Sequence, residues 1–62
     1  MKFKVGQLVR HKTNSAQAGQ EMIITYVDDY KYYNTAENHY TCRWMADSKI
    51  YEEIFSEIEL VA

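Results

Sequence analysis

The segment Met22-Ile23-Ile24-Thr25-Tyr26-Val27 carries the clearest fold signal in the chain. Its β-branched and aromatic residues suit a pleated, half-buried surface, and its length is ordinary for a β-strand. We therefore expect residues 22–27 to form a strand. The rest of the fold can be worked out from this segment in both directions.

A second strand is predicted over residues 39–45, because apolar and polar residues alternate there. The alternation places Tyr40, Cys42 and Trp44 on one face, which we assign to the core. Between the two strands, residues 34–38 have turn chemistry, while residues 28–33 are compatible with a loop or with an extension of the strand. The two strands are expected to form a long hairpin.

The opening residues 3–12 alternate through Phe3 and Val5 and resume at Leu8 and Val9, so Gly6 is expected at a turn or bulge. Residues 13–20 are small and polar, which predicts a loop.

The last third of the chain admits two interpretations. Ile50, Ile54, Ile58 and Val61 recur at helical spacing, which favours an amphipathic helix. We prefer a strand through Phe55, a single helical turn opened by Ser56 and a short closing strand at residues 60–61. Parity does not decide which face of this strand points inward.

These elements predict a mainly β fold, a small barrel of about five short antiparallel strands with a short helical turn near the C-terminus. Closure of a small sheet into a barrel also hides its edges. The expected inward residues are Val5, Val9, Met22, Ile24, Tyr40, Cys42, Trp44 and Phe55.

Length and composition limit the possibilities. A chain of 62 residues is expected to form one domain, residues 1–62, around one core. Cys42 is the single cysteine, so no disulfide forms within the chain, and no apolar run is long enough to span a bilayer. The expected location is a reducing cytoplasm, without a membrane partner.

Several residues along most of the chain have a recognisable order and spacing: Phe3, Val5, Gly6, Val9, Lys12, Met22, Ile24, Cys42, Trp44, Phe55 and Leu60. This order and spacing resembles the YodC-like family of small, uncharacterised bacterial proteins. This resemblance covers most of the chain and implies an SH3-like barrel, but it implies no activity and no functional residue. Gln7 stands where that family usually has an acidic residue, and the stretches 13–20 and 30–38 are longer here.

No catalytic or metal-binding motif is present in the sequence. Cys42 with His11 or His39 is the only nucleophile arrangement available, but a cysteine between two inward aromatic residues is typically an inert core group. One cysteine and two histidines lack metal-ligand spacing. The carboxylates near the C-terminus indicate a solvated acidic edge. We therefore expect no enzyme activity, no catalytic residue, no metal and no cofactor.

Charge is distributed unevenly, although the net charge is only −2. The first twenty residues carry basic side chains without acidic ones, and the last thirteen carry four glutamates without a base. Neutralisation between neighbouring terminal strands is the simpler explanation. The alternative is a nucleic-acid-binding barrel with Trp44 or a tyrosine as a stacking platform. Its candidate residues are Lys2, Lys4, Arg10, Lys12 and Arg43.

The leading functional hypothesis concerns a tyrosine-rich segment. Tyr30, Lys31, Tyr32 and Tyr33 are the candidate binding residues, because tyrosine provides a large contact area at low entropic cost. Cross-strand packing of tyrosines within the hairpin is the alternative. The hypothesis predicts a non-enzymatic module that binds another protein or a second copy of itself.

Overall fold

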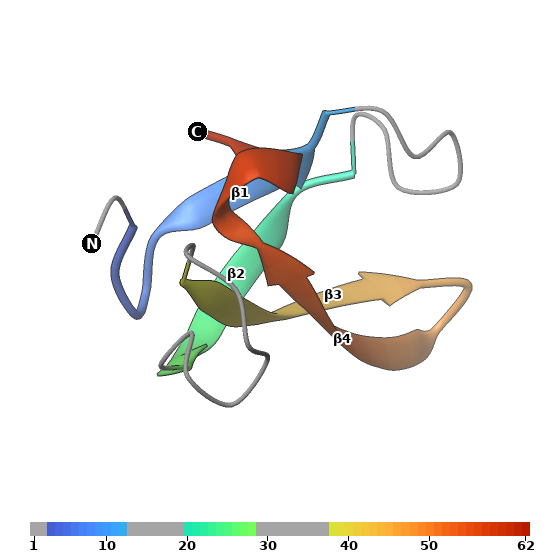
Figure 1. Cartoon of the computed structure of the whole chain (residues 1–62). Helices are drawn as coiled ribbons and strands as arrows, with labels where there is room; N and C mark the ends of the chain where they lie inside the picture. Colours follow the sequence, from blue (N-terminus) through green and yellow to red (C-terminus); the bar gives the residue numbers. More distant parts are fainter. Residues whose placement is uncertain (1–2, 13–19, 29–37) are drawn as a thin grey trace.

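A computed structural model describes residues 3–12, 20–28 and 38–62 of the chain. In these residues, five antiparallel strands curl into a half-barrel with the order β4-β3-β2-β1-β5 (Figure 1). The prediction of a mainly β, SH3-like barrel with five antiparallel strands is confirmed. The elements are β1 (Leu8–His11), β2 (Met22–Asp28), β3 (His39–Ala46), β4 (Lys49–Ser56), the 3-10 turn η2 (Glu57–Glu59) and β5 (Leu60–Val61).

The strand interpretation of the last third is confirmed, and the helical one is wrong. Strand β4 runs through Phe55, Ser56 precedes η2, and Leu60–Val61 forms β5. The isoleucines of this segment have the spacing of an apolar helical stripe, but Ile50 and Ile54 belong to a strand. In the structure, Ile50 lies opposite Met45 and Ile54 opposite Thr41, on the outer face of the sheet.

The core lies on the concave face of the half-barrel. Six of the eight residues predicted to point inward are buried there, and Trp44 is partly buried against them. Phe3 and Leu60 complete the core. The buried members are Phe3, Val9, Met22, Ile24, Tyr40, Cys42, Phe55 and Leu60.

The inward position predicted for Val5 is wrong, because its side chain is 60% exposed. The backbone N–H of Gln7 donates to the Lys4 carbonyl at 3.1 Å, and Gly6 has φ 92°, as in a turn that requires a positive φ at its third position. Val5 sits at the second position of this turn and points to solvent. The turn expected at Gly6 therefore breaks the alternation that placed Val5 inside.

A bulge in β2 determines which tyrosine faces outward. The register between β2 and β3 shifts between Ile24 and Tyr26, so that Tyr26 pairs with Thr41 and Val27 with Tyr40. Without the bulge, Tyr26 would share the inward face of Ile24. It is instead 61% exposed on the outer face.

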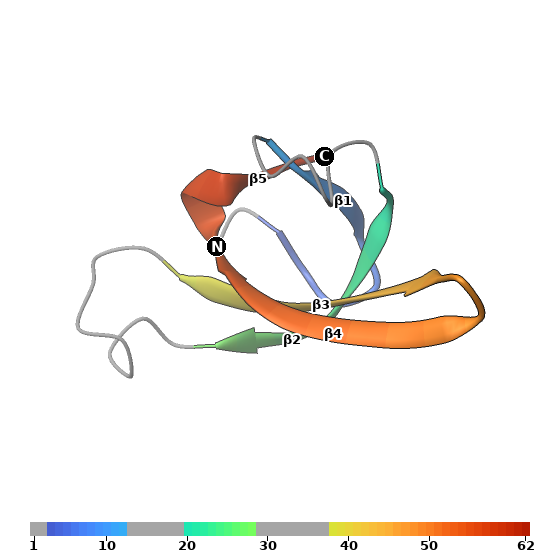
Figure 2. The same cartoon turned by 90° about the vertical axis from the view of Figure 1, so that its right-hand side faces the viewer.

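A tight turn joins β3 to β4. Asp47 and Ser48 have φ 53° and 63°, the left-handed values of a two-residue hairpin turn. The register continues without interruption from Ala46 opposite Lys49 to His39 opposite Ser56. Figure 2 shows the turn end of this hairpin projecting to one side of the molecule.

Candidate functional site

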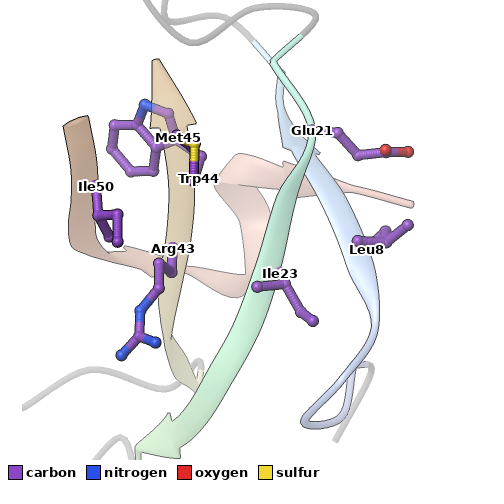
Figure 3. Close-up of a pocket in the computed structure, with 7 residues that line it drawn as sticks. All are labelled: Leu8, Glu21, Ile23, Arg43, Trp44, Met45 and Ile50. Carbon is purple, nitrogen blue, oxygen red and sulfur yellow. The ribbon is translucent and has the colours of Figure 1, made fainter. Parts of the chain in front are cut away.

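The β3–β4 hairpin separates from β2 and leaves a hollow on the outer face of the sheet. The last pair between β2 and β3 joins Ile23 and Arg43, whereas β3 continues to pair with β4 up to Ala46. The hollow has a volume of about 310 Å³ and lies where these strands diverge (Figure 3). We call it the outer hollow; its lining residues are Leu8, Glu21, Ile23, Arg43, Trp44, Met45 and Ile50.

Strand register brings the aliphatic residues of the outer hollow together. Leu8 pairs with Ile23 across β1 and β2, and Met45 pairs with Ile50 across β3 and β4. Residues that lie opposite one another in an antiparallel pair project from the same face. All four side chains are between 40% and 68% exposed. Four strands thus contribute to one apolar surface that faces solvent.

Arg43 and Glu52 lie beside this surface and neutralise each other. The Arg43 guanidinium donates to the Glu52 carboxylate from Nη2 at 3.0 Å and from Nε at 3.3 Å. Both side chains are about half exposed, so the ion pair contributes little to stability. It does hold the guanidinium across the sheet and cancels its charge.

The sequence pattern contained a signal for the outer hollow. In β1 and β2, apolar residues occupy the inward and the outward positions in succession, as at Leu8 and Val9 or at Met22 and Ile23. A sheet with one solvated face normally alternates apolar with polar residues. The departure from alternation indicates a second apolar face.

One of the basic residues considered for nucleic-acid binding is neutralised by a neighbouring carboxylate. Arg43 is paired with Glu52, while Lys4 is exposed in the opening turn, Arg10 on β1 and Lys12 directly after β1. Arg10 lies opposite Val61 of β5, as expected for neighbouring terminal strands. Lys2 lies outside the described residues.

The tyrosine-rich segment, Tyr30, Lys31, Tyr32 and Tyr33, also lies outside the described residues. The tyrosines on either side of this segment in the sequence, Tyr26 and Tyr40, lie in β2 and β3. Tyr26 is on the outer face, and Tyr40 is completely buried. The hydroxyl of Tyr40 donates to a Glu57 carboxylate oxygen and accepts from the Phe3 backbone N–H at 3.2 Å.

Cys42 occupies the buried position that its aromatic neighbours predicted. Its thiol is 0% exposed and lies 3.8 Å from the Tyr40 carbonyl oxygen. Burial raises the pKa of the Cys42 thiol to about 11. The nucleophilic thiolate is therefore disfavoured, because a charged sulfur is poorly solvated in an apolar core.

His11 is directed toward η2 rather than toward Cys42. Its ring is buried, packs edge-on against Phe55 at 4.9 Å, and has Nε2 at 3.4 Å from the Glu59 carboxylate. Sequence reasoning did not anticipate this contact. Neutralisation between the terminal strands was expected from lysine and arginine, whereas this contact to Glu59 comes from His11.

The described residues contain no cluster of three or more histidine, cysteine, aspartate or glutamate side chains able to hold a metal ion. No helix among them has the length and apolarity needed to cross a membrane.

The described fold and site define a small antiparallel half-barrel with an apolar hollow on its outer face. Comparisons of the chain with protein-family models, with curated proteins and with solved structures find no match. Membership of the YodC-like family thus remains a prediction.

Proposed function

We propose that the protein is a small, non-enzymatic module that binds another protein, and that the outer hollow receives an apolar side chain of that partner. One observation carries the proposal: Leu8, Ile23, Met45 and Ile50 come from four strands and share one solvent-facing surface. Single exposed apolar residues are common on proteins, but a contiguous group typically marks an interaction site.

The form of the hollow favours a protein partner over a small molecule. Small-molecule sites enclose most of the ligand and place several polar groups around it. The outer hollow is an open depression on a sheet, with Glu21 and Arg43 as its charged members. An aliphatic floor with a polar rim is the usual pattern of a protein–protein interface.

Charge and lining also favour protein over nucleic acid. Nucleic-acid binding requires uncompensated cations near exposed aromatic rings on which bases stack. Beside the hollow, Arg43 is neutralised by Glu52, and the ring of Trp44 is stacked on Tyr51. The nucleic-acid alternative therefore lacks a supporting observation on this face.

The tyrosine-rich segment of residues 30–33 stays part of the proposal as a second contact. Its support is the sequence: three tyrosines and a lysine within four residues provide the large, semi-polar side chains that are enriched in binding surfaces.

The experiment compares outer-hollow variants with a matched control in partner recovery. Leu8→Thr combined with Ile23→Thr places β-branched threonines, which suit exposed strand positions, but removes the apolar contacts. Val61→Thr makes the same kind of change at an exposed position on β5, which does not line the hollow. Proteins retained by the tagged wild type are identified, and each is titrated in purified form.

We expect the double variant to bind the purified partner at least about tenfold more weakly than wild type, since two apolar contacts are lost. The Val61→Thr control should bind like wild type. Equal affinity of the double variant and wild type, or the absence of any protein retained by the wild type, contradicts the proposal.

A further inference from the structure

Strand β4 forms one edge of the sheet and is long, exposed and apolar in part. In the strand order of the described residues, β4 pairs with β3 on one side only. Six of its eight residues, from Lys49 to Ile54, are exposed. An edge strand of this length presents a row of backbone donors and acceptors that can pair with another chain.

The hairpin register determines which backbone groups point away from β3. Ala46 and Lys49 flank the two-residue turn and form its closing hydrogen-bonded pair. Hydrogen bonds to β3 then recur at every second residue of β4, namely at Tyr51 and Glu53. The N–H and C=O groups of Ile50, Glu52 and Ile54 therefore point to the open edge.

We propose that β4 pairs antiparallel with β4 of a second copy of the chain, around a two-fold axis that passes beside Tyr51. This pairing joins the two half-barrels through one continuous sheet. It places Lys49 of each copy opposite Glu53 of the other. The partner that pairs with the β4 edge is thus a second copy of the chain, and it is favoured by the opposite charges of Lys49 and Glu53.

Charge also selects this register over its neighbours. An isologous antiparallel pair places one residue opposite its own counterpart on the axis. With Glu52 or Glu53 on the axis, two carboxylates lie directly opposite each other, which is destabilising. With Tyr51 on the axis, the charged residues of the inward face form two pairs of opposite charge. Lys49 of each copy lies opposite Glu53 of the other copy.

The remaining registers are shorter or less regular. With Ile50 on the axis, Glu53 lies opposite Asp47, a second carboxylate in the turn. With Ile54 on the axis, Tyr51 lies opposite Glu57, which belongs to η2 rather than to a strand. The register centred on Tyr51 is the one that pairs β4 residues with unlike charges.

Aromatic packing supports an axis at Tyr51. The Tyr51 ring is 39% exposed and stacks on Trp44, with centroids 5.6 Å apart and an interplanar angle of 15°. The backbone N–H and C=O groups of Tyr51 point toward β3 and away from the open edge, so Tyr51 forms a non-hydrogen-bonded pair with Tyr51 of the other copy. In an antiparallel sheet, the Cα atoms of such a pair are closer together than those of a hydrogen-bonded pair. Two stacks of Trp44 on Tyr51 then meet across the axis and cover each other's exposed rings.

Glu53 explains why the edge does not pair indiscriminately. A charged side chain on the inward face of an edge strand normally blocks further pairing. A strand that presents a cation opposite Glu53 removes this obstacle, and β4 itself provides Lys49 at the required spacing. The hairpin end that bears these residues projects from the half-barrel, where a second copy has access (Figure 2).

The test is a charge-reversal cycle measured by sedimentation equilibrium. Lys49→Glu and Glu53→Lys each turn two opposite-charge pairs into like-charge pairs, so we expect each to raise the dimer Kd about tenfold. The double variant restores opposite charges and should return the Kd to within a few-fold of wild type. Lys4→Glu, an exposed reversal outside β4, is the control and should dimerise like wild type.

A cross-linking measurement checks the register independently. Residues in a non-hydrogen-bonded pair lie about 4.5 Å apart at Cα, which suits a disulfide. Tyr51→Cys should therefore form a cross-linked dimer under mild oxidation, with the bridge located by mass spectrometry at position 51. Glu53→Cys should not, because in this register the two Glu53 positions are four residues out of alignment.

A wild-type protein that stays monomeric at every concentration overturns the inference. So does a double variant that dimerises as weakly as the single reversals, or a Glu53→Cys protein that cross-links more readily than Tyr51→Cys. The inference does not depend on the proposed function. The Leu8→Thr and Ile23→Thr substitutions should leave the dimer Kd unchanged, so each proposal can fail without the other.

Discussion

Nε2 of His11 lies 3.4 Å from a carboxylate oxygen of Glu59. This contact connects β1 to η2, the 3-10 turn that precedes the last strand. The same carboxylate accepts from the Ser56 backbone N–H at 2.8 Å and from the Ser56 hydroxyl at 3.2 Å. The Lys12 N–H also donates to the Glu59 carbonyl at 2.9 Å. Glu59 thus closes the half-barrel by holding η2 against β1.

Glu59 makes stability depend on acid pH. Burial by itself raises the pKa of the Glu59 carboxyl, but hydrogen bonds from Ser56 and His11 outweigh it and lower the pKa below 4.5. A carboxyl whose pKa is lower in the folded state than in the unfolded state stabilises the fold at pH values above its ordinary pKa. This stabilisation is lost as the pH falls through the lowered pKa. Glu59→Gln should cost about 0.5–1 kcal/mol at neutral pH and flatten the loss of stability below pH 4.5.

Chemical denaturation at a series of pH values measures this effect. Glu21→Gln, an exposed substitution on the outer face, is the matched control and should keep the wild-type pH profile. An unchanged acid profile in Glu59→Gln contradicts the role assigned to this carboxylate.

Tyr40 combines core packing with two hydrogen bonds of its hydroxyl. In Tyr40→Phe, the Phe3 N–H loses its 3.2 Å acceptor and Glu57 loses a donor. We expect a loss of roughly 1–3 kcal/mol in the free energy of unfolding. Tyr26→Phe removes the same hydroxyl from an exposed ring and should change stability by less than about 0.5 kcal/mol. Equal effects of the two substitutions would count against the buried role of the Tyr40 hydroxyl.

The β3–β4 turn holds two residues other than glycine in left-handed backbone geometry, and Ser48 suits this geometry poorly. Asp47 and Ser48 both have positive φ, which Asn-Gly accommodates better than other pairs. Asp47→Asn combined with Ser48→Gly should stabilise the protein by about 1 kcal/mol, or roughly 4–8 °C in Tm. Ser48→Ala is the control and should give no increase. A lower Tm in the Asn-Gly variant would show that the turn depends on other contacts.

Cys42 should be unreactive in the folded protein. Its thiol is buried and has a pKa of about 11, so a thiol reagent at neutral pH should label it only after unfolding. The measurement compares labelling rates in native buffer and in denaturant. Rapid labelling under native conditions would revive the nucleophile interpretation.

Tyr32 and Tyr33 are the residues through which the sequence-based binding hypothesis can be tested. Tyr32→Ser combined with Tyr33→Ser should leave the Tm nearly unchanged and abolish recovery of the partner. Loss of the folded state in this variant would mean that the tyrosines serve packing instead.

Local signals were sufficient to predict most of the strands. Residues 22–27 and 39–45 carry alternation and β-propensity within a few positions, so strands β2 and β3 and the inward face of Tyr40 and Cys42 follow from neighbouring residues alone. The same holds for the turn at Gly6 and for the helical turn after Ser56.

The alternation of apolar and polar residues does not predict the inward face correctly where one residue in a turn or bulge reverses which positions point inward. Val5 was expected inside because it follows Phe3 by two positions, but the Gly6 turn directs it outward. The bulge between Ile24 and Tyr26 does the same in β2. Such local irregularities are selected by the fit of the whole sheet, which a pattern of spacings does not contain.

The amino-acid sequence by itself determined that this chain forms short antiparallel strands around an aromatic core with a buried cysteine, since propensity and alternation act between near neighbours. Only the tertiary structure decided that Leu8, Ile23, Met45 and Ile50 share one hollow, and that His11 meets Glu59. Each of these depends on the register between segments that are distant in the chain, and register is decided by the packing of the complete sheet.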